Sequence, residues 1–198
     1  IRFRRSLFAA DSHEPGFMAV DIITKPGFDN WRGSTGFGAR SDALNARNAF
    51  APVKGDERLD RFSVSFNGPL QKQKTSLAFN VEGTDAYDTK TIVAALPAGP
   101  LADSVRKPNQ VLNLSGRIEH QLTASQILRG ELQRNHLFND NVGVGNFDLL
   151  ERASATTRDE TVARLSLAGS LRKSLYNELR FQFRGESFTT TPASQAPA

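Results

Sequence analysis

The chain has 198 residues, a net charge of +4, 38% hydrophobic residues and no cysteine. The lack of cysteine excludes thiol chemistry and disulfides, and the scattered charges do not form the basic stripe of a nucleic-acid-binding protein. No run of about 18 apolar residues marks a transmembrane helix. The mean hydropathy of −0.41 is compatible with a membrane β-barrel, because lipid-facing and lumen-facing residues alternate along its strands.

The first 30 residues differ from the rest and are more basic. They begin at Ile1 without an initiator Met or the apolar core of a signal peptide, so we expect a piece of a longer protein. Residues 18–25 predict one short strand that ends in the turn at Lys25-Pro26-Gly27. Residues 2–8 predict another strand, and residues 11–16 a loop. The expected boundary lies at residues 28–30.

Beyond this boundary the dominant pattern is an alternation of apolar and polar residues with a period of two. Trp31 and Phe37, for example, alternate with Arg32 and Arg40. Such alternation gives each strand one apolar and one wet face. The pattern predicts seven strands, most of them near the length of about ten residues that a tilted membrane strand needs. They are centred on residues 31–40, 62–67, 76–82, 112–119, 128–133, 164–171 and 178–184.

The predicted connections alternate between long and short. Long segments cover residues 41–58, 84–109 and 137–159, and short turns fall at 68–73, 123–125 and 172–174. Outer-membrane barrels have long extracellular loops on one rim and short periplasmic turns on the other. The fold class we predict is therefore all-β, an antiparallel transmembrane β-barrel portion. Since seven strands leave two open edges, we expect either a curved open sheet or a structure that forms only within a larger protein, and not a closed barrel.

A soluble β-sandwich or soluble barrel is the alternative, because it shares the period of two. Compact soluble domains prefer short connections, which favours the membrane barrel. The two hypotheses differ in where they place Leu112, Leu114, Phe181 and Phe183. A soluble module has these side chains in a core, whereas a membrane barrel has them on an outer apolar band.

Several segments together resemble a known family. Residues 20–27 read Val-Asp-Ile-Ile-Thr-Lys-Pro-Gly and residues 30–34 read Asn-Trp-Arg-Gly-Ser, which looks like the plug-to-barrel junction of TonB-dependent receptors. Residues 40–50 (Arg-Ser-Asp-Ala-Leu-Asn-Ala-Arg-Asn-Ala-Phe) resemble the first extracellular loop of the Oar-like branch of these receptors. Residues 67–70, 143–149 and 177–181 are similar to later segments of that branch.

This resemblance implies a receptor with a plug and a barrel of 22 strands, of which the chain would hold a part. Residues 1–30 would be the C-terminal part of the plug domain, and residues 31–198 the N-terminal strands of the barrel. The intact protein would take up a large or scarce ligand across the outer membrane, driven by the TonB complex. Its partners would be outer-membrane lipid and an oligosaccharide, peptide or siderophore. A small self-contained barrel or surface adhesin without transport remains the alternative.

The sequence predicts no enzyme, no cofactor, no metal site and no catalytic residues. The three histidines lack ligand spacing, and we expect them at solvated loops or strand ends; they are His13, His120 and His136. Gly143-Val144-Gly145 lacks the Lys-Ser/Thr of a phosphate loop, so we interpret it as a flexible loop tip. Asp140, Asn141 and Asp148 do not have the spacing of an EF-hand. The ligand-binding residues are unknown at this stage.

Charged residues on the wet faces predict an interstrand charge ladder, with plug docking and solvation of the lumen as its role. The residues concerned are Arg32, Arg40, Arg117, Glu119, Arg129, Glu131, Arg164, Glu178 and Arg180. Trp31 and Tyr176 both adjoin predicted short turns. Aromatic residues with a polar edge favour membrane interfaces, so both are predicted to mark the periplasmic girdle.

Overall fold

The structure is a computed structural model, and it describes residues 2–4, 19–21, 29–46, 54–172 and 175–193. This part of the chain is all-β, apart from two short 3₁₀ turns, η1 (Asp42–Leu44) and η2 (Leu150–Arg152). No helix within the described ranges is long and apolar enough to cross a membrane.

Two antiparallel sheets make up the fold. The smaller pairs β1 (Arg2–Arg4) with β2 (Ala19–Asp21). These strands lie within the two segments predicted as strands at residues 2–8 and 18–25; the rest of both segments, with His13 and the predicted loop at 11–16, lies outside the described residues. The seven strands of the larger sheet are β3 (Arg32–Ser41), β4 (Arg58–Gln71), β5 (Thr75–Leu96), β6 (Gly99–Thr123), β7 (Gln126–Val142), β8 (Ser154–Arg172) and β9 (Leu175–Pro192).

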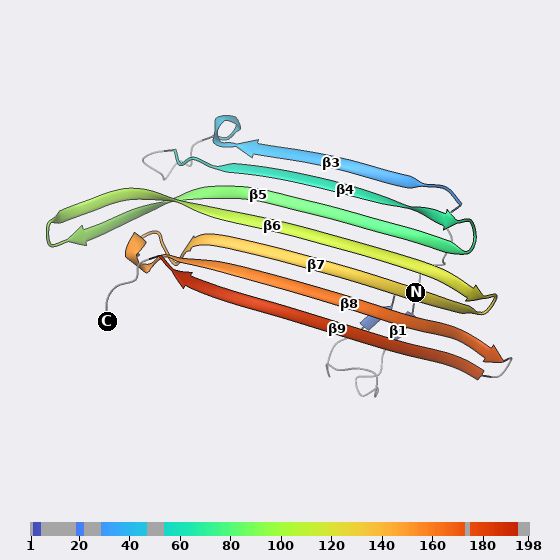
Figure 1. Cartoon of the computed structure of the whole chain (residues 1–198). Coiled ribbons are helices and arrows are strands. Elements are labelled where there is room, and N and C mark those ends of the chain that lie inside the picture. Colours follow the sequence, from blue (N-terminus) through green and yellow to red (C-terminus); the bar gives the residue numbers. More distant parts are fainter. Residues whose placement is uncertain (1, 5–18, 22–28, 47–53, 173–174, 194–198) are drawn as a thin grey trace.

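The larger sheet is an open meander in which each strand pairs with its neighbours in sequence, from β3 to β9 (Figure 1). This arrangement confirms the prediction of seven antiparallel strands with open edges at the first and the seventh. The strands are longer than predicted. The six from β4 to β9 have between 14 and 25 residues, whereas about 9–11 residues are enough to cross a bilayer when tilted.

The turns between β4 and β5 and between β6 and β7 lie at one end of the sheet, with the adjoining ends of β8 and β9; the β5–β6 turn and the β7–β8 connection lie at the opposite end (Figure 1). We call these the turn end and the loop end. At the turn end, residues 124–125 form a turn within the predicted segment 123–125, whereas the turn predicted at 68–73 lies at 72–74 because β4 continues to Gln71; residues 173–174 lie outside the described part. At the loop end, the long connections at 41–58 and 137–159 are confirmed in shortened form, as residues 42–57 and 143–153 between the strands.

The prediction of a long loop at residues 84–109 is wrong. These residues continue β5 and β6, which pair without a break as far as Leu96 and Gly99 around a two-residue turn. Thr89, Thr91, Ile92 and Val93 are β-branched and favour strands. The segment lacks a plain apolar–polar alternation, because both of its faces lie beyond the apolar part of the sheet. Periodicity therefore could not detect it.

Candidate functional site

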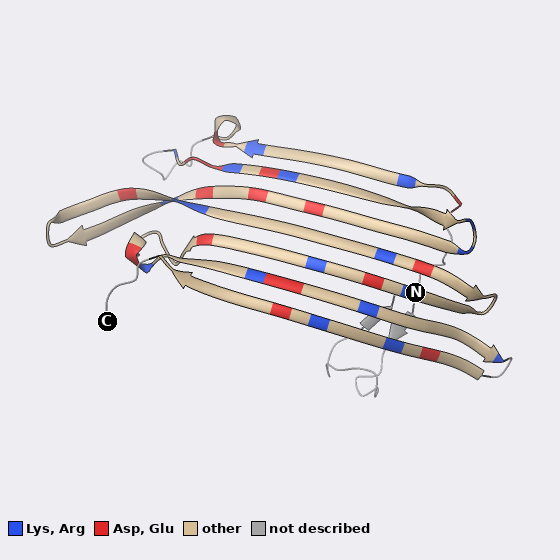
Figure 2. Ribbon diagram, viewed as in Figure 1, with Lys and Arg blue, Asp and Glu red and all other residues tan. Residues whose placement is uncertain are grey.

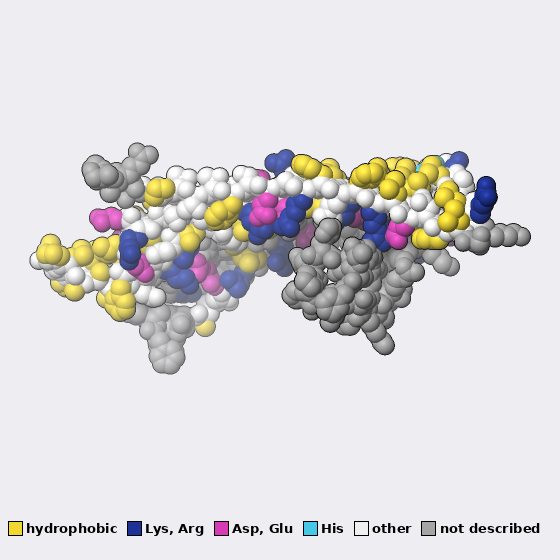
Figure 3. Space-filling view, turned by 90° about the horizontal axis from the view of Figure 1, so that it is seen from below, with side chains coloured by type: hydrophobic (Ala, Val, Ile, Leu, Met, Phe, Trp, Pro, Cys, Tyr) yellow, Lys and Arg dark blue, Asp and Glu magenta, His cyan; other side chains and the backbone are white. Residues whose placement is uncertain are grey.

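The larger sheet has one apolar and one polar face, and the apolar face is the more exposed one. Phe62, Leu132 and Phe183 are 44%, 56% and 65% exposed. On the opposite face Ser76 and Glu119 are only 3% exposed. In an edge-on view, hydrophobic side chains gather along one side towards the turn end, and charged side chains on the other (Figure 3). This distribution is the reverse of that in a soluble protein.

The side chains that distinguish the membrane barrel from a soluble module lie on the exposed apolar face. Leu112, Phe181 and Phe183 are 37%, 60% and 65% exposed, and Leu114 on the same face is half-buried. The soluble alternative requires these four residues in a core, and the structure does not place them in one. The hydrophobic cluster found among the described residues lies elsewhere, at the loop end.

The apolar face forms a band that crosses the strands obliquely. On β4 it ends, towards the loop end, at Phe62; on β9 it ends at Phe183. The cross-strand register at the level of Phe62 passes through Gly83, Leu112, His136, Asp159 and Ser187. Phe183 is four residues nearer the turn end than Ser187. Over five strand spacings this offset corresponds to a slope of roughly 30°, close to the strand tilt of about 35–45° in barrels.

Only one of the two predicted girdle aromatics lies on the apolar face. Trp31 covers Gly68 at the turn end, and the centre of its ring lies 6.0 Å from that of Phe66 at a tilt of 40°. The Phe66 ring in turn lies 5.2 Å from that of Phe79. Tyr176 also lies at the turn end, opposite Ser170. However, strand alternation gives it the orientation of Glu178 on the polar face. The prediction for Tyr176 is therefore wrong, because Tyr176 is an even-numbered position of β9 and the apolar residues of that strand are odd-numbered.

Basic and acidic residues are interspersed along β6, β7 and β8 (Figure 2), and on the polar face they form a network of ion pairs. Buried Glu119 accepts from Arg129 at 2.9 Å and lies 3.5 Å from Arg117. Further along, the Arg164 guanidinium lies 3.6 Å from Glu131. These contacts confirm the central part of the predicted charge ladder.

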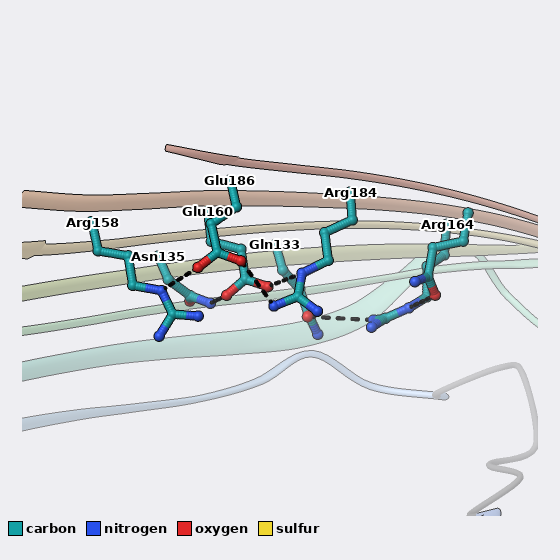
Figure 4. A network of polar contacts seen from close by, with 8 residues as sticks. Gln133, Asn135, Arg158, Glu160, Arg164, Arg184 and Glu186 are labelled. Atoms are coloured by element: carbon teal, nitrogen blue, oxygen red, sulfur yellow. Dashed lines mark hydrogen bonds and ion pairs between the residues drawn. The ribbon is translucent and has the colours of Figure 1, made fainter. Parts of the chain in front are cut away.

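A second group of polar contacts continues the network onto β9 (Figure 4). Arg184 lies 2.8 Å from Glu160 and 3.2 Å from Glu186, and Arg158 lies 2.7 Å from Glu186. Arg164 donates to Gln182 on β9 at 3.0 Å. The predicted ladder lacks most of these residues, because each predicted strand ends where its apolar residues end. The same alternation of odd and even positions, continued towards the loop end, predicts that they share the polar face.

The remaining predicted ladder residues lie outside this network. Arg40 on edge strand β3 lies 3.7 Å from Glu57, which precedes β4. Arg180 pairs with Glu178 of its own strand. Arg32 lies on the same face of β3, separated from the network by β4 and β5. The prediction of an interstrand ladder is therefore wrong for Arg32, Arg40, Glu178 and Arg180.

A shallow hollow of about 280 Å³ lies on the polar face over β4 to β7. Polar side chains dominate its lining, including Asn67, Asn80, Ser115, Arg117 and Glu131. Because Arg117 and Glu131 are also cross-strand partners in the charge network, the hollow and the ion pairs form one continuous polar surface.

At the loop end, β5 and β6 extend beyond both neighbouring strands. Pairing with β4 ends at Tyr87 and pairing with β7 ends at Asn109. We call residues 88–107 the arm. Its nine cross-strand pairs, at about 3.4 Å per residue, project roughly 30 Å from the sheet. The two strands of the arm stay paired along their whole length and twist around each other (Figure 1).

The connection between β7 and β8, residues 143–153, binds to the arm through hydrogen bonds and packing contacts. We call it the clamp. Asn146 donates to the Thr91 carbonyl at 2.9 Å and accepts from the Val93 amide at 2.7 Å, which adds a parallel bridge to β5. Val144 and Ala153 of the clamp pack on Ile92 and Val105 of the arm. The interpretation of residues 143–145 as a flexible loop tip is therefore wrong.

Contacts of the segment before β4 tie it to the base of the arm. Arg106 reaches Asp56 at 2.8 Å and lies 4.9 Å from the centre of the Tyr87 ring. The hydrogen bond to Asp56 raises the pKa of Arg106. Thr89 also donates to the Asp56 carbonyl at 2.7 Å. The arm is thus fixed from two connections that are far apart in sequence.

The two described histidines lie in different strands and have different partners. His120 shares a hydrogen bond of 2.8 Å with Thr75, and His136 lies 2.9 Å from Asp159. In the described part of the chain, no three His, Asp or Glu side chains are grouped so that they could hold a metal ion.

Comparison with known proteins adds no relative to this picture. No family model, curated protein or solved structure matches the chain.

Proposed function

We propose that residues 31–198 form part of an outer-membrane β-barrel, with the apolar face towards lipid and the polar face towards the lumen. The observation that carries this proposal is the inverted distribution of side chains, in which Phe62, Leu132 and Phe183 are exposed while Glu119 is covered. A large exposed apolar surface marks a site of contact with lipid or protein. Lipid accounts for it best, because the band runs across every strand of the sheet and charged side chains lie opposite it.

The shape of the sheet supports a definite orientation. In outer-membrane barrels the short turns face the periplasm and the longer connections face outwards. The turn end, with Trp31 at the edge of the apolar face, would then be periplasmic. The arm and the clamp would lie outside the cell, where they are the first parts to meet an extracellular ligand.

The intact protein, in this proposal, is a TonB-dependent receptor. This step rests on the resemblance of residues 20–27, 40–50 and 143–149 to the Oar-like branch. Residues 1–30 would be the end of the plug, and the polar face with its ion pairs would hold the plug in the lumen. The ligand would be an oligosaccharide, a peptide or a siderophore.

The open edges of the sheet favour a large barrel over a small self-contained one or an adhesin. Strand β3 and strand β9 each pair on one side. Unpaired edges invite aggregation unless other strands cover them. Moreover, Leu179, Phe181 and Phe183 carry the apolar band as far as the β9 edge, so a following strand with the same alternation would extend it.

Cysteine labelling of the intact protein tests the membrane orientation. Residues 1–198 contain no cysteine, so single cysteines can be introduced at Phe147 in the clamp and Lys72 in the first turn, with any cysteine elsewhere in the intact protein replaced by serine. A membrane-impermeant maleimide should label Phe147→Cys in intact cells and Lys72→Cys only after the outer membrane is permeabilised. Equal labelling of both in intact cells would reject the proposed orientation.

Formaldehyde cross-linking in cells separates the receptor from the alternative functions without knowledge of the ligand. A TonB-dependent receptor should give a covalent complex with TonB that an antibody to TonB detects. A self-contained barrel or adhesin should give none. Correct cysteine labelling without any TonB complex would retain the barrel and reject the receptor.

A further inference from the structure

The outer part of the arm consists of apolar residues and glycine alone. Residues 92–102 read Ile-Val-Ala-Ala-Leu-Pro-Ala-Gly-Pro-Leu-Ala and form the end of the β5–β6 hairpin (Figure 1). The clamp packs on Ile92, but Val93 is 55% exposed and Ala95 is also exposed. Exposed apolar surface of this kind marks a site of contact with another molecule.

The two strands of the arm pair with each other and with no further strand of the sheet, so the arm has two edges. The clamp shows which backbone groups of β5 face its edge. Asn146 bonds to the Thr91 carbonyl and the Val93 amide on the side away from β6. In an antiparallel pair, every second residue directs both its N–H and its C=O away from the partner strand. The next residue of β5 with this orientation is Ala95.

The β6 edge of the arm is closed to an additional strand. The residues that direct their backbone groups to this edge are the even-numbered ones, which lie opposite odd-numbered residues of β5. They include Pro100 and Pro108. Proline has no N–H to donate, and edge strands use it to avoid pairing. Between these two prolines, the Arg106 carbonyl accepts from the Asn141 side chain at 2.7 Å.

The β5 edge is open beyond the clamp. After Asn146 the clamp turns away, and Asp148 bonds back to Gly145 at 3.1 and 3.2 Å. No described residue bonds to the Val93 carbonyl or to the amide and carbonyl of Ala95. These backbone groups can therefore bond to an incoming chain. The bridge to Asn146 shows that this edge accepts a strand.

We propose that the β5 edge of the arm binds an extended peptide segment of the extracellular ligand by strand addition, next to the bridge made by Asn146. The inference rests on the proposed function, which places the arm outside the cell, and it selects a peptide from the three ligand classes. Strand addition requires N–H and C=O groups that repeat along an extended chain. An oligosaccharide has no such repeat, and a small chelator is too short to follow the strand. Alternate side chains of the peptide contact Val93 on one face of the arm and Leu96 on the other, which favours apolar residues.

Fluorescence anisotropy with the intact protein in detergent tests this site. The probe is a labelled hexapeptide of alternating threonine and valine. It is compared with two forms that are N-methylated at alternate residues, either the second and fourth or the third and fifth. An added strand directs only every second N–H to its neighbour. One methylated form should therefore bind about tenfold more weakly, through loss of backbone hydrogen bonds, and the other should bind as well as the parent peptide.

Two proline variants locate the site on one edge of the arm. Ala95→Pro removes the free N–H from the β5 edge, whereas Ala102→Pro removes the equivalent N–H from the β6 edge. Proline is tolerated at edge positions of this kind, and circular dichroism checks that both variants are folded. Ala95→Pro should bind the parent peptide about tenfold more weakly, and Ala102→Pro should bind it normally.

Each of the other outcomes overturns the inference. A parent peptide that does not bind shows that the edge accepts no added strand. Equal binding of all three peptides shows that side chains alone hold the peptide. Equal losses in Ala95→Pro and Ala102→Pro show a general distortion of the arm. Self-association of the protein that Ala95→Pro abolishes shows that a second copy of the chain occupies the edge.

Failure of this inference can be told apart from failure of the proposed function. If the cysteines at Phe147 and Lys72 label as expected but the peptide does not bind, the barrel stands and the peptide site is rejected. If the labelling itself contradicts the orientation, the proposed function is rejected, and the site for an extracellular peptide is rejected with it.

Discussion

Glu160 on β8 lies directly opposite Glu186 on β9, and Arg184 contacts both carboxylates. Like charges at directly opposed positions destabilise a strand pair. Here the guanidinium lies 2.8 Å from Glu160 and 3.2 Å from Glu186, and Arg158 neutralises Glu186 from the other side at 2.7 Å. On its polar face the last strand pair of the described sheet is therefore joined by two arginines, of which Arg184 contacts both carboxylates (Figure 4).

Replacement of Arg184 by Gln should destabilise the intact protein by roughly 1 kcal/mol, a modest value because the side chain is half exposed and screened. The measurement is urea unfolding of the protein in lipid. The folded fraction is read from gels, on which a folded barrel and its heat-denatured form migrate differently. Adding Glu186→Gln should restore most of the loss, since it removes the repulsion. Arg61→Gln, on the same face, serves as the control. A double variant as unstable as Arg184→Gln would contradict the bridging role.

A charged side chain should lower the stability of the folded protein far more on the apolar face than on the polar face. Val64 and Ser63 are neighbours on β4 with opposite orientations, and Val64 is 38% exposed. Arg at the centre of a lipid-facing surface costs about 2–4 kcal/mol. Val64→Arg should therefore reduce the folded fraction in outer-membrane preparations, whereas Ser63→Arg, which lies near Glu82, should fold normally. If the apolar face were bathed in water, Val64→Arg would be harmless.

Gly169 should tolerate no side chain. Its φ of +152° is one that other residues rarely adopt, and a Cβ atom would collide with the backbone carbonyl of Ser125. We expect Gly169→Ala to cost about 1–3 kcal/mol through backbone strain. The check is urea unfolding, with Gly116→Ala as control because its Cβ position is open. Equal stability of the two variants would argue against the close approach of β8 to the β6–β7 turn.

The clamp should release the arm when Gly145 is replaced by Val. Gly145 has a φ of +125°, and a Cβ atom there would lie 3.1 Å from the Cβ of Lys90. The change should break the bridge to β5 and speed amide hydrogen exchange at Val93, which donates to Asn146. Gly38→Val is the matched control, because its Cβ position is open. Unchanged exchange at Val93 in Gly145→Val would show that the clamp does not depend on this residue.

Periodicity predicted the sheet well where the apolar and polar faces differ most. From Phe62 to Phe66 and from Leu179 to Phe183 the alternation is regular, and the structure confirms both strand position and orientation. Parity along the strands likewise predicted that Arg117, Glu131 and Arg164 share one face. Opposed residues on neighbouring strands had to meet once the register was set, so part of the ion-pair network followed from sequence.

The same reasoning failed where local pattern carries no information about long-range pairing. The arm was predicted as a loop, since residues 88–107 lack regular alternation, and the clamp was predicted as a free tip. The bridge between Asn146 and β5 joins residues more than 50 positions apart. The residues of the clamp that form this bridge have positive φ angles at Gly143, Gly145 and Asn146.

The sequence by itself determined the all-β class, the number of strands in the larger sheet and the face on which most side chains lie, because a period of two leaves each residue only two orientations. Tertiary structure alone decided the register between strands. That register fixes the oblique course of the apolar band from Phe62 to Phe183 and the opposition of Glu160 and Glu186. Each depends on backbone pairing between distant segments, which no local sequence pattern encodes.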